Sequence, residues 1–252
     1  IGVNYKHIWS NRAYTNTSIS NSTKQSDAHF LNINSGQTVF NIVENTNVKN
    51  IRQVNHLKLG PVSKMEFGFD TEINDTDYNY YRKLPESSVF VNEIQFDRLV
   101  STVNYSAFIT LKKNLFSRLI FSAGMRLDQN DYEKVNLISP RMNLDYELVR
   151  GKTNLIINSG LYHQNPPAIY IANNASKKLK SVKARQHSIS LEHMLTPSTK
   201  LSLSAYQKEY SDSPILPGET LHSDPTFLFD ELRMYNGIVS NGTALSDGLE
   251  IL

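Results

Sequence analysis

The sequence contains no cysteine among its 252 residues, and this absence excludes three kinds of chemistry. Without a thiol the chain cannot form a disulfide framework, a thiolate metal site or a cysteine nucleophile. It also lacks any apolar run near the roughly 18 residues that a membrane-spanning helix requires. A strand of a membrane barrel needs only about 9–11 residues and is apolar on one face, so the missing run does not exclude a membrane.

An excess of charge of one sign is lacking as well. The 26 basic and 24 acidic residues leave a net charge of +2, which gives no support for nucleic-acid binding. The first residues, IGVNYKHIW, have neither the basic start nor the apolar core of a signal peptide. The chain opens in what reads as the middle of a strand and closes in another at GLEIL, so we expect a fragment of a larger domain.

The pattern that is present is strict alternation, clearest between residues 115 and 162. Side chains alternate faces along a strand, so this pattern predicts three strands with one apolar and one polar face. We expect the apolar face to carry Leu119, Phe121, Ala123, Met125, Leu127, Met142, Leu144, Tyr146, Leu148, Leu155, Ile157 and Leu161. We expect the polar face to carry Arg118, Ser122, Gly124, Arg126, Asp128, Arg141, Asn143, Asp145, Glu147, Asn154, Asn158, Gly160 and Tyr162.

Short and long connections alternate along the whole chain. We expect short turns near 10–12, 60–62, 112–115, 149–152 and 196–199, and long polar loops at 24–46, 74–98, 129–137, 164–183 and 211–240. Period-two counting gives about eleven strands between them. This arrangement predicts an all-β fold, an antiparallel up-and-down transmembrane β-barrel with short periplasmic turns and longer extracellular loops. The first strand would then run towards the periplasm.

A soluble β-sandwich is the alternative, because its strands also alternate. The strands here are roughly twice the length of about 5–6 residues that is usual in soluble sheets, which favours the barrel. Aromatic residues at the strand ends fit two membrane interfaces, with Tyr132, Tyr162 and Tyr210 at the loop ends and Trp9 and Phe116 at the turn ends. The ordinary preference of strands for aromatic residues would explain them equally.

The run from Ile138 to Tyr210 resembles the barrel of TonB-dependent outer-membrane receptors. The pieces that carry the resemblance are Ser139-Pro140-Arg141, the run GLYHQNPP from Gly160 to Pro167, Leu191-Glu192-His193 with Thr196-Pro197, the run AYQKEY from Ala205 to Tyr210 with Pro217, and Gly242-Thr243-Ala244 through Gly248-Leu249-Glu250. The resemblance is good over residues 99–252 and weaker over 1–98. It implies a barrel of about 22 strands with a plug inside, of which residues 1–252 would be a partial domain without the plug and the closing carboxy-terminal strand.

The resemblance implies a receptor barrel in the outer membrane of a Gram-negative bacterium that mediates energised uptake of an external solute, and not an enzyme. The implied partners are outer-membrane lipid, the TonB complex through the absent plug, and a solute of unknown class, with no cofactor and no nucleic acid. A passive porin-like or structural barrel remains an alternative. The soluble β-sandwich would be an adhesin or a sugar-binding module.

The polar face mixes charges of both signs. These residues are Lys64, Glu66, Asp70, Glu72, Arg118, Arg126, Asp128, Arg141, Asp145 and Glu147. We interpret them as a hydrated wall of compensating charges, with a ligand path or a plug-binding wall as the alternative.

No catalytic or metal site is predicted. Asp145 and Glu147 share a face but have no pocket signal, so an acid/base pair is not favoured. His187 and His193 share a face too far apart to ligate one metal. Neither a Walker loop nor a Gly-x-Ser-x-Gly elbow occurs.

The best candidates for binding are aromatic, amide and imidazole side chains in the loop after residue 161. They are Tyr162, His163, Gln164, Asn165 and Tyr170. Aromatic rings beside amides suit recognition of an external solute. In the alternative interpretation, Tyr162 is an anchor at the membrane interface and Pro166-Pro167 only stiffens the loop.

Overall fold

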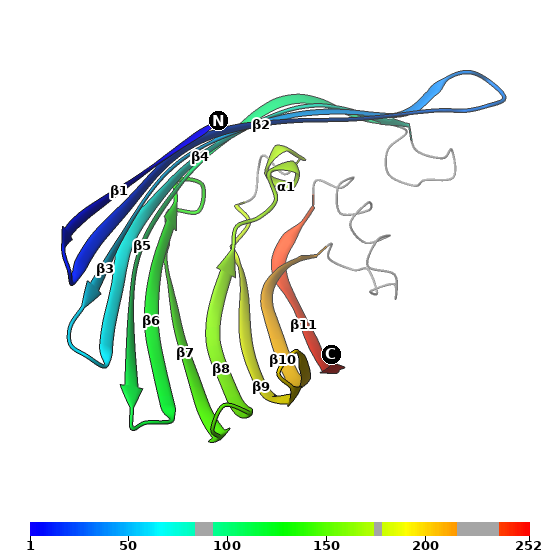
Figure 1. The fold of residues 1–252 in the computed structure, drawn as a ribbon. Helices are drawn as coiled ribbons and strands as arrows, with labels where there is room; N and C mark the ends of the chain where they lie inside the picture. The colour runs from blue at the N-terminus through cyan, green and yellow to red at the C-terminus, as the bar shows by residue number, and fades with distance from the viewer. Residues whose placement is uncertain (84–92, 174–177, 216–236) are drawn as a thin grey trace.

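A computed structural model describes residues 1–83, 93–173, 178–215 and 237–252. Within these ranges the chain forms one continuous sheet of eleven antiparallel strands whose spatial order is their order in the sequence (Figure 1). In the described part of the chain, one short helix accompanies the sheet. The prediction of an up-and-down sheet of about eleven strands is therefore confirmed.

The elements have the following bounds. They are β1 (Gly2–Ser10), β2 (Ala13–Leu31), β3 (Thr38–Lys58), β4 (Ser63–Lys83), β5 (Glu93–Leu115), β6 (Leu119–Asn130), β7 (Asn136–Val149), β8 (Thr153–Gln164), α1 (Ala168–Asn173), β9 (Val182–Thr196), β10 (Thr199–Ile215) and β11 (Val239–Ile251).

All the short turns lie at one end of the sheet and the longer connections lie at the other, as Figure 1 shows. One turn differs from its predicted position. Lys112-Lys113-Asn114, expected to turn the chain, continue in β5 and pair with β4 and β6. The chain reverses instead at 116–118, where Phe116 adopts a φ of 60°.

The prediction of long loops at 24–46 and 74–98 was wrong. Most of these residues belong to β2, β3, β4 and β5, which are 19, 21, 21 and 23 residues long. At about 3.3 Å per residue, 21 residues extend about 70 Å, far beyond a hydrocarbon layer about 30 Å thick. The outer parts of these strands need no apolar face, so their sequence reads as polar loop although the ladder continues.

The other predicted loops are also shorter than expected. The connections are 131–135 in place of 129–137 and 165–181 in place of 164–183. Between β10 and β11, strand structure extends to Ile215 and resumes at Val239, and part of the predicted 211–240 loop lies outside the described residues.

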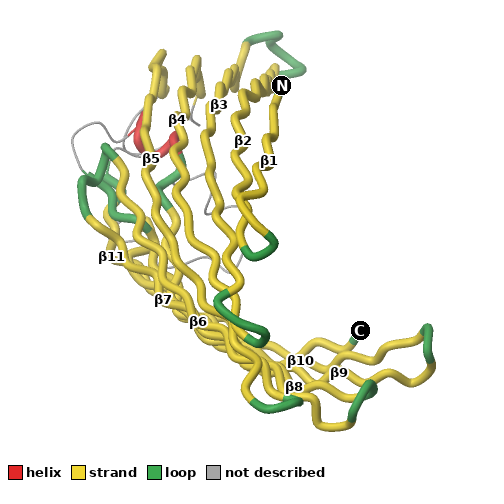
Figure 2. The backbone as a smooth tube through the Cα atoms, turned by 60° about the vertical axis from the view of Figure 1, so that its left-hand side comes forward, coloured by secondary structure: helices red, strands yellow, loops and turns green. Residues whose placement is uncertain are grey.

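The sheet is strongly curved (Figure 2). The alternating apolar residues lie on its convex face, and the alternating polar residues lie on the concave face, against which α1 packs. Large apolar side chains on the convex face are exposed, for example Phe69 at 44%, Met125 at 53% and Leu203 at 45%. Phe121 pairs laterally with Leu144, which pairs with Ile157. No second sheet is formed by the described residues, so these side chains are not the core of a sandwich. Such an exposed apolar band is the lipid-facing surface expected of a membrane barrel.

The buried core is small and lies on the concave face, under α1. Tyr78 and Tyr80 of β4 and Val100 of β5 pack there with residues of the 165–181 connection. The residues contributed by that connection are Ile169, Tyr170, Ala172 and Leu179. Among the described residues, no helix has the length and apolar character to cross a membrane.

The aromatic residues at the loop ends do not form the expected interface. The Tyr162 ring lies 4.3 Å from the Arg141 guanidinium on the concave face. The Tyr132 hydroxyl accepts a hydrogen bond from the Leu179 N–H, at 2.9 Å, and the ring packs on the inner core. Tyr210 alternates onto the face of Tyr206, which is the polar one. Tyr162 and Tyr210 face inward because of their positions in the alternation of β8 and β10. Tyr132 faces inward because it contacts the 165–181 connection.

At the turn ends, Trp9 and Phe116 remain exposed, at 67% and 88%. The Trp9 indole Nε1 donates a hydrogen bond to Thr15 Oγ1 at 2.8 Å. Both aromatic residues therefore lie at the edge of the sheet where the turn-end interface was expected.

Candidate functional site

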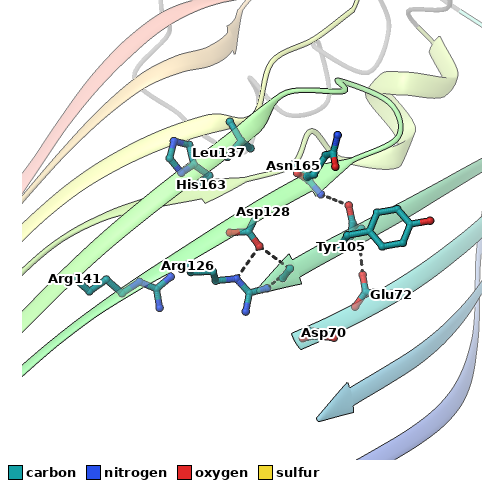
Figure 3. A pocket seen from close by; sticks show the side chains of 12 residues that line it. Asp70, Glu72, Tyr105, Arg126, Asp128, Leu137, Arg141, His163 and Asn165 are labelled. Atoms are coloured by element: carbon teal, nitrogen blue, oxygen red, sulfur yellow. Dashed lines mark hydrogen bonds and ion pairs between the residues drawn. The ribbon is translucent and has the colours of Figure 1, made fainter. Parts of the chain in front are cut away.

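A cavity of about 210 Å³ opens on the concave face, towards the longer connections (Figure 3). We refer to it as the wall cavity. Its polar lining includes Asp70, Glu72, Asn104, Ser106, Arg126, Asp128, Gln129, Arg141, His163 and Asn165. The donors and acceptors come from five neighbouring strands and the connection that follows β8.

Strand register places these side chains together. Asp70 of β4 lies directly opposite Ser106 of β5, which lies opposite Asp128 of β6. Glu72 and Asn104 form the next facing pair, two residues along the same strands. Directly opposed residues share a face, so the alternation of each strand delivers a two-row polar patch.

Arg126 and Asp128, at the centre of the lining, form an ion pair that Ser106 bridges. Arg126 Nε lies 2.7 Å from Asp128 Oδ1, and Arg126 Nη2 donates to Ser106 Oγ at 2.6 Å. The Ser106 hydroxyl donates in turn to Asp128 Oδ1 at 2.7 Å. The Arg126 and Asp128 side chains are only 29% and 27% exposed, and their charges compensate each other within the wall.

The remaining charges are less constrained. Asp70 accepts one hydrogen bond from the Asn50 amide, at 2.6 Å, and Glu72 accepts a long one from Asn104, at 3.5 Å. The Arg141 guanidinium lies over the Tyr162 ring and forms no ion pair with a carboxylate of the described residues. Asp70, Glu72 and Arg141 can therefore offer charge to a polar solute.

Asn165 connects the wall to the segment that covers it. Its Nδ2 donates to Asn104 Oδ1 at 2.6 Å, across 61 residues of sequence. Its Oδ1 accepts from Asn130 Nδ2 at 3.0 Å and from Ser181 Oγ at 3.2 Å. Both ends of the 165–181 connection are thus tied at one amide, which fixes α1 beside the cavity.

His163 reaches the cavity because β7 and β8 separate. Their pairing ends at Arg141 and Gly160, whereas the next residues of β8 stay paired with β9 as far as Gln164. His163 Nδ1 lies 2.9 Å from the hydroxyl of Ser139, which is 1% exposed. As a result Tyr162 and His163, although consecutive, both contact residues of the concave face.

The structure separates the five predicted binding residues. His163 and Asn165 line the wall cavity, and Tyr162 lies next to it on Arg141. Gln164 lines an adjoining cavity of about 240 Å³ that shares Glu72, Asn104 and Asn165 with the first. Tyr170 is 1% exposed and packs in the inner core. Their binding of a solute stays a prediction.

Sequence reasoning had placed Asp70, Glu72, Arg126, Asp128 and Arg141 on the polar face without assigning them to a site. It missed Asn104 and Ser106, which also line the cavity. The sequence of β5 could have identified them, because Asn104 and Ser106 alternate with its apolar residues and therefore lie on the polar face.

Structural partners are present for His187, His193 and Glu147, three of the groups considered for catalysis or metal binding. His187 Nδ1 lies 3.0 Å from Ser159 Oγ and His193 Nδ1 lies 2.8 Å from Thr153 Oγ1, each across one strand pair. Glu147 accepts the Gly151 N–H in a turn, at 2.6 Å. In the part of the chain that the structure describes, no three His, Asp or Glu residues are grouped so as to hold a metal ion.

Comparison with known proteins gives consistent matches. The family model described as TonB dependent receptor-like, beta-barrel, matches residues 1–251. The copper transporter OprC superposes with a TM-score of 0.72 at 14% identity, over 99% of this chain and 42% of that one. A search of curated proteins found no match.

Two further structures are similar. The ferric enterobactin receptor PfeA of Pseudomonas aeruginosa has a TM-score of 0.64 at 13% identity, over 99% of this chain and 40% of that one. The ferric-catecholate import receptor Fiu of E. coli K12 has 0.69 at 11% identity, over 99% and 43%. The chain thus spans about two fifths of the length of these structures. All three are described as receptors or transporters, none as an enzyme.

Proposed function

The chain belongs to the family of TonB-dependent receptor-like β-barrels, and from this premise we propose that it forms the wall of an outer-membrane receptor that takes up an external solute with energy delivered through TonB. The family is one of the Gram-negative outer membrane. An exposed apolar band on the convex face and a polar concave face support this placement, because a barrel wall meets hydrocarbon outside and water inside.

Residues 1–252 are proposed to form one partial barrel domain. Within the described ranges β1 pairs only with β2 and β11 only with β10, so the sheet has two unpaired edges. Unpaired edges are not stable at membrane depth, and closure needs further strands. We place about eleven more strands and the plug outside these residues, in line with the 22-stranded plugged transporters.

The observation that carries the solute proposal is the wall cavity, which the 165–181 connection covers and contacts through Asn165. His163 and Asn165 would contact the solute directly, with Tyr162 and Gln164 at the margins. Tyr170 would act only as a support, because its ring is buried under α1. The free donors and acceptors on Asp70, Glu72 and Arg141 fit a polar solute entering from the side of the long connections.

Uptake by cells that produce the full-length receptor tests this proposal. Radioactive copper and ferric enterobactin are the first probes, since structural neighbours are described with them. Accumulation should cease when a protonophore removes the inner-membrane gradient. Asn165→Ala removes the hydrogen bonds of the 165–181 connection to Asn104 and Asn130 and should lower accumulation. Asn158→Ala should not, because Asn158 bonds to Asn143 and Ser188 outside the wall cavity.

A passive porin would behave differently in two measurements. Its uptake would survive the protonophore, and the full-length protein would give a steady ionic conductance in a planar lipid bilayer, because porins leave an aqueous channel. A plugged receptor should show no such conductance. Steady conductance together with protonophore-resistant uptake would contradict the proposed function.

A further inference from the structure

The convex face changes character between β4 and β3. Directly opposed residues share a face of a sheet, so rows of them can be followed from strand to strand. On β4, two neighbouring rows contain the apolar residues Phe67 and Phe69. The same rows continue onto β3, β2 and β1, at one end of the sheet (Figure 1), with side chains that carry polar groups. One row continues with Asn55, Thr15 and His7, and the other with Gln53, Thr17 and Tyr5. We refer to these six residues as the convex polar patch.

The patch lies at the depth of the hydrocarbon. Gln53 is five positions before the end of β3 at Lys58, and Tyr5 is five positions before the end of β1 at Ser10. At about 3.3 Å per residue and a tilt near 40°, both lie about 13 Å above the turns, near the middle of an apolar band about 25 Å tall. Leu144 is equally far from the end of β7 and carries the apolar side chain expected at this depth.

The row nearer the turns is satisfied within the chain. The Trp9 indole Nε1 donates a hydrogen bond to Thr15 Oγ1 at 2.8 Å, and the Thr15 hydroxyl donates to Asn55 Oδ1 at 2.7 Å. Asn55 Nδ2 donates in turn to the Phe67 carbonyl oxygen at 3.3 Å. These polar groups therefore need no partner from outside the chain.

The row at mid-depth is not satisfied in the same way. The Tyr5 hydroxyl lies 3.1 Å from His7 Nδ1. The Gln53 amide and the Thr17 hydroxyl, by contrast, have no hydrogen-bond partner among the described residues. Lipid tails offer neither donor nor acceptor, and a glutamine side chain is too short to reach water from the middle of the layer. A protein neighbour that supplies hydrogen bonds would remove this cost.

We propose that the convex polar patch is the contact between two copies of this receptor in the outer membrane, related by a two-fold axis. The patch contains no lysine, arginine or carboxylate, so two copies can meet without repulsion between like charges. A primary amide has two donors and one acceptor, so it pairs with an identical amide through two N–H···O hydrogen bonds. A two-fold contact brings Gln53 against its own counterpart, which is the arrangement that this pairing requires.

Apolar side chains continue the contact on the side away from the turns. Val3, Ile19 and Ile51 form the next convex row and are 68%, 55% and 46% exposed. They would pack around the amide pair and exclude lipid from it. The inference rests on the proposed membrane placement and not on the solute, so a failed uptake experiment leaves it standing. Leu144→Arg tests that placement by itself.

Energy transfer between two differently labelled populations of the full-length receptor, mixed in phospholipid vesicles, tests the association. We expect transfer above the level of random encounters and its loss on dilution with unlabelled receptor. Gln53→Leu should raise the dissociation constant roughly tenfold, because two hydrogen bonds within the membrane are lost. Asn143→Leu is the matched control, because this amide lies on the concave face beside Leu144 and donates to Asn158. It should leave the transfer unchanged.

Disulfide formation locates the contact. Residues 1–252 contain no cysteine, so Gln53→Cys adds a single thiol to this part of the receptor, and any cysteine elsewhere is replaced by serine. A mild oxidant applied to isolated outer membranes should join two copies through position 53. Leu144→Cys, at the same depth on β7, should give no joined pair.

Three outcomes would overturn the proposal. Energy transfer no greater than that of random encounters means that lipid covers the patch. Transfer that Gln53→Leu leaves unchanged, without a disulfide at position 53, means that the copies meet elsewhere. Protection of the position-53 thiol from a lipid-soluble maleimide, without joining of two copies, means that a different protein covers it.

Discussion

Placing one charge on the convex face tests whether that face meets lipid. Leu144 is on the apolar face of β7, paired with Phe121 and Ile157, five positions before the end of the strand at Val149. At about 3.3 Å per residue and a tilt near 40°, this position lies about 13 Å above the turn, close to the middle of an apolar band about 25 Å tall. Leu144→Arg should therefore destabilise the barrel by about 2–4 kcal/mol, the cost of a cation at the bilayer midplane.

Arg141→Leu is the opposite change on the same strand, three residues away on the concave face. It removes a guanidinium from the Tyr162 ring, an exposed cation–π contact worth about 0.5–1 kcal/mol. Leu144→Ala separates lost packing from added charge. The assay is equilibrium unfolding of the full-length receptor by guanidinium in phospholipid vesicles, followed by circular dichroism. A larger loss for Arg141→Leu than for Leu144→Arg would mean that the two faces are inverted and that the barrel interpretation is wrong.

Two further changes test the inner core and the close approach of strands. Tyr170→Ala removes a ring that is 1% exposed, so we expect a local loss of about 3–5 kcal/mol. Faster hydrogen exchange of residues 168–173, with unchanged exchange in β6–β8, is the measurement, and the exposed Lys178→Ala is the control. Gly68→Ala places a methyl group against the Gln53 carbonyl oxygen, which is backbone and cannot rotate away. Its unfolding midpoint should fall by the equivalent of about 1–3 kcal/mol. Gly160→Ala should cost less, because its methyl group would meet side-chain atoms of Tyr162 and Arg141, at 3.0 Å and 3.2 Å. Equal losses for the two glycines would count against the strand packing described.

The sequence predicts β6, β7 and β8 well because these strands are short. Each is 12–14 residues long, so nearly all of it crosses the hydrocarbon and must keep one apolar face. The longer β2 and β3 lose this constraint beyond the membrane. In those outer parts Asn, Ser and Thr form the same backbone hydrogen bonds as other residues. The sequence there shows no alternation of apolar and polar residues from which a strand could be predicted.

The wall cavity is predictable only in part for a different reason. Alternation of side chains along a strand is enough to place Asp70 and Arg126 on the concave face, because it depends only on neighbouring residues of the same strand. The cavity also depends on the inward fold of the 165–181 connection, whose contacts include the hydrogen bond between Asn165 and Asn104. That contact joins residues 61 apart and leaves no periodic trace. Without it, Tyr170 reads as a solute ligand, although its ring is buried.

One signal of the inward fold does exist in β4. From Met65 to Ile73 the apolar residues occupy odd positions, the convex face. Beyond Ile73 the relation reverses, because Asp75 and Asp77 are convex and Tyr78 and Tyr80 are concave. A strand whose apolar side changes face has left the lipid on one side and met a protein cover on the other. The reversal indicates that something lies over the concave face above the membrane, and α1 with its connection is that cover.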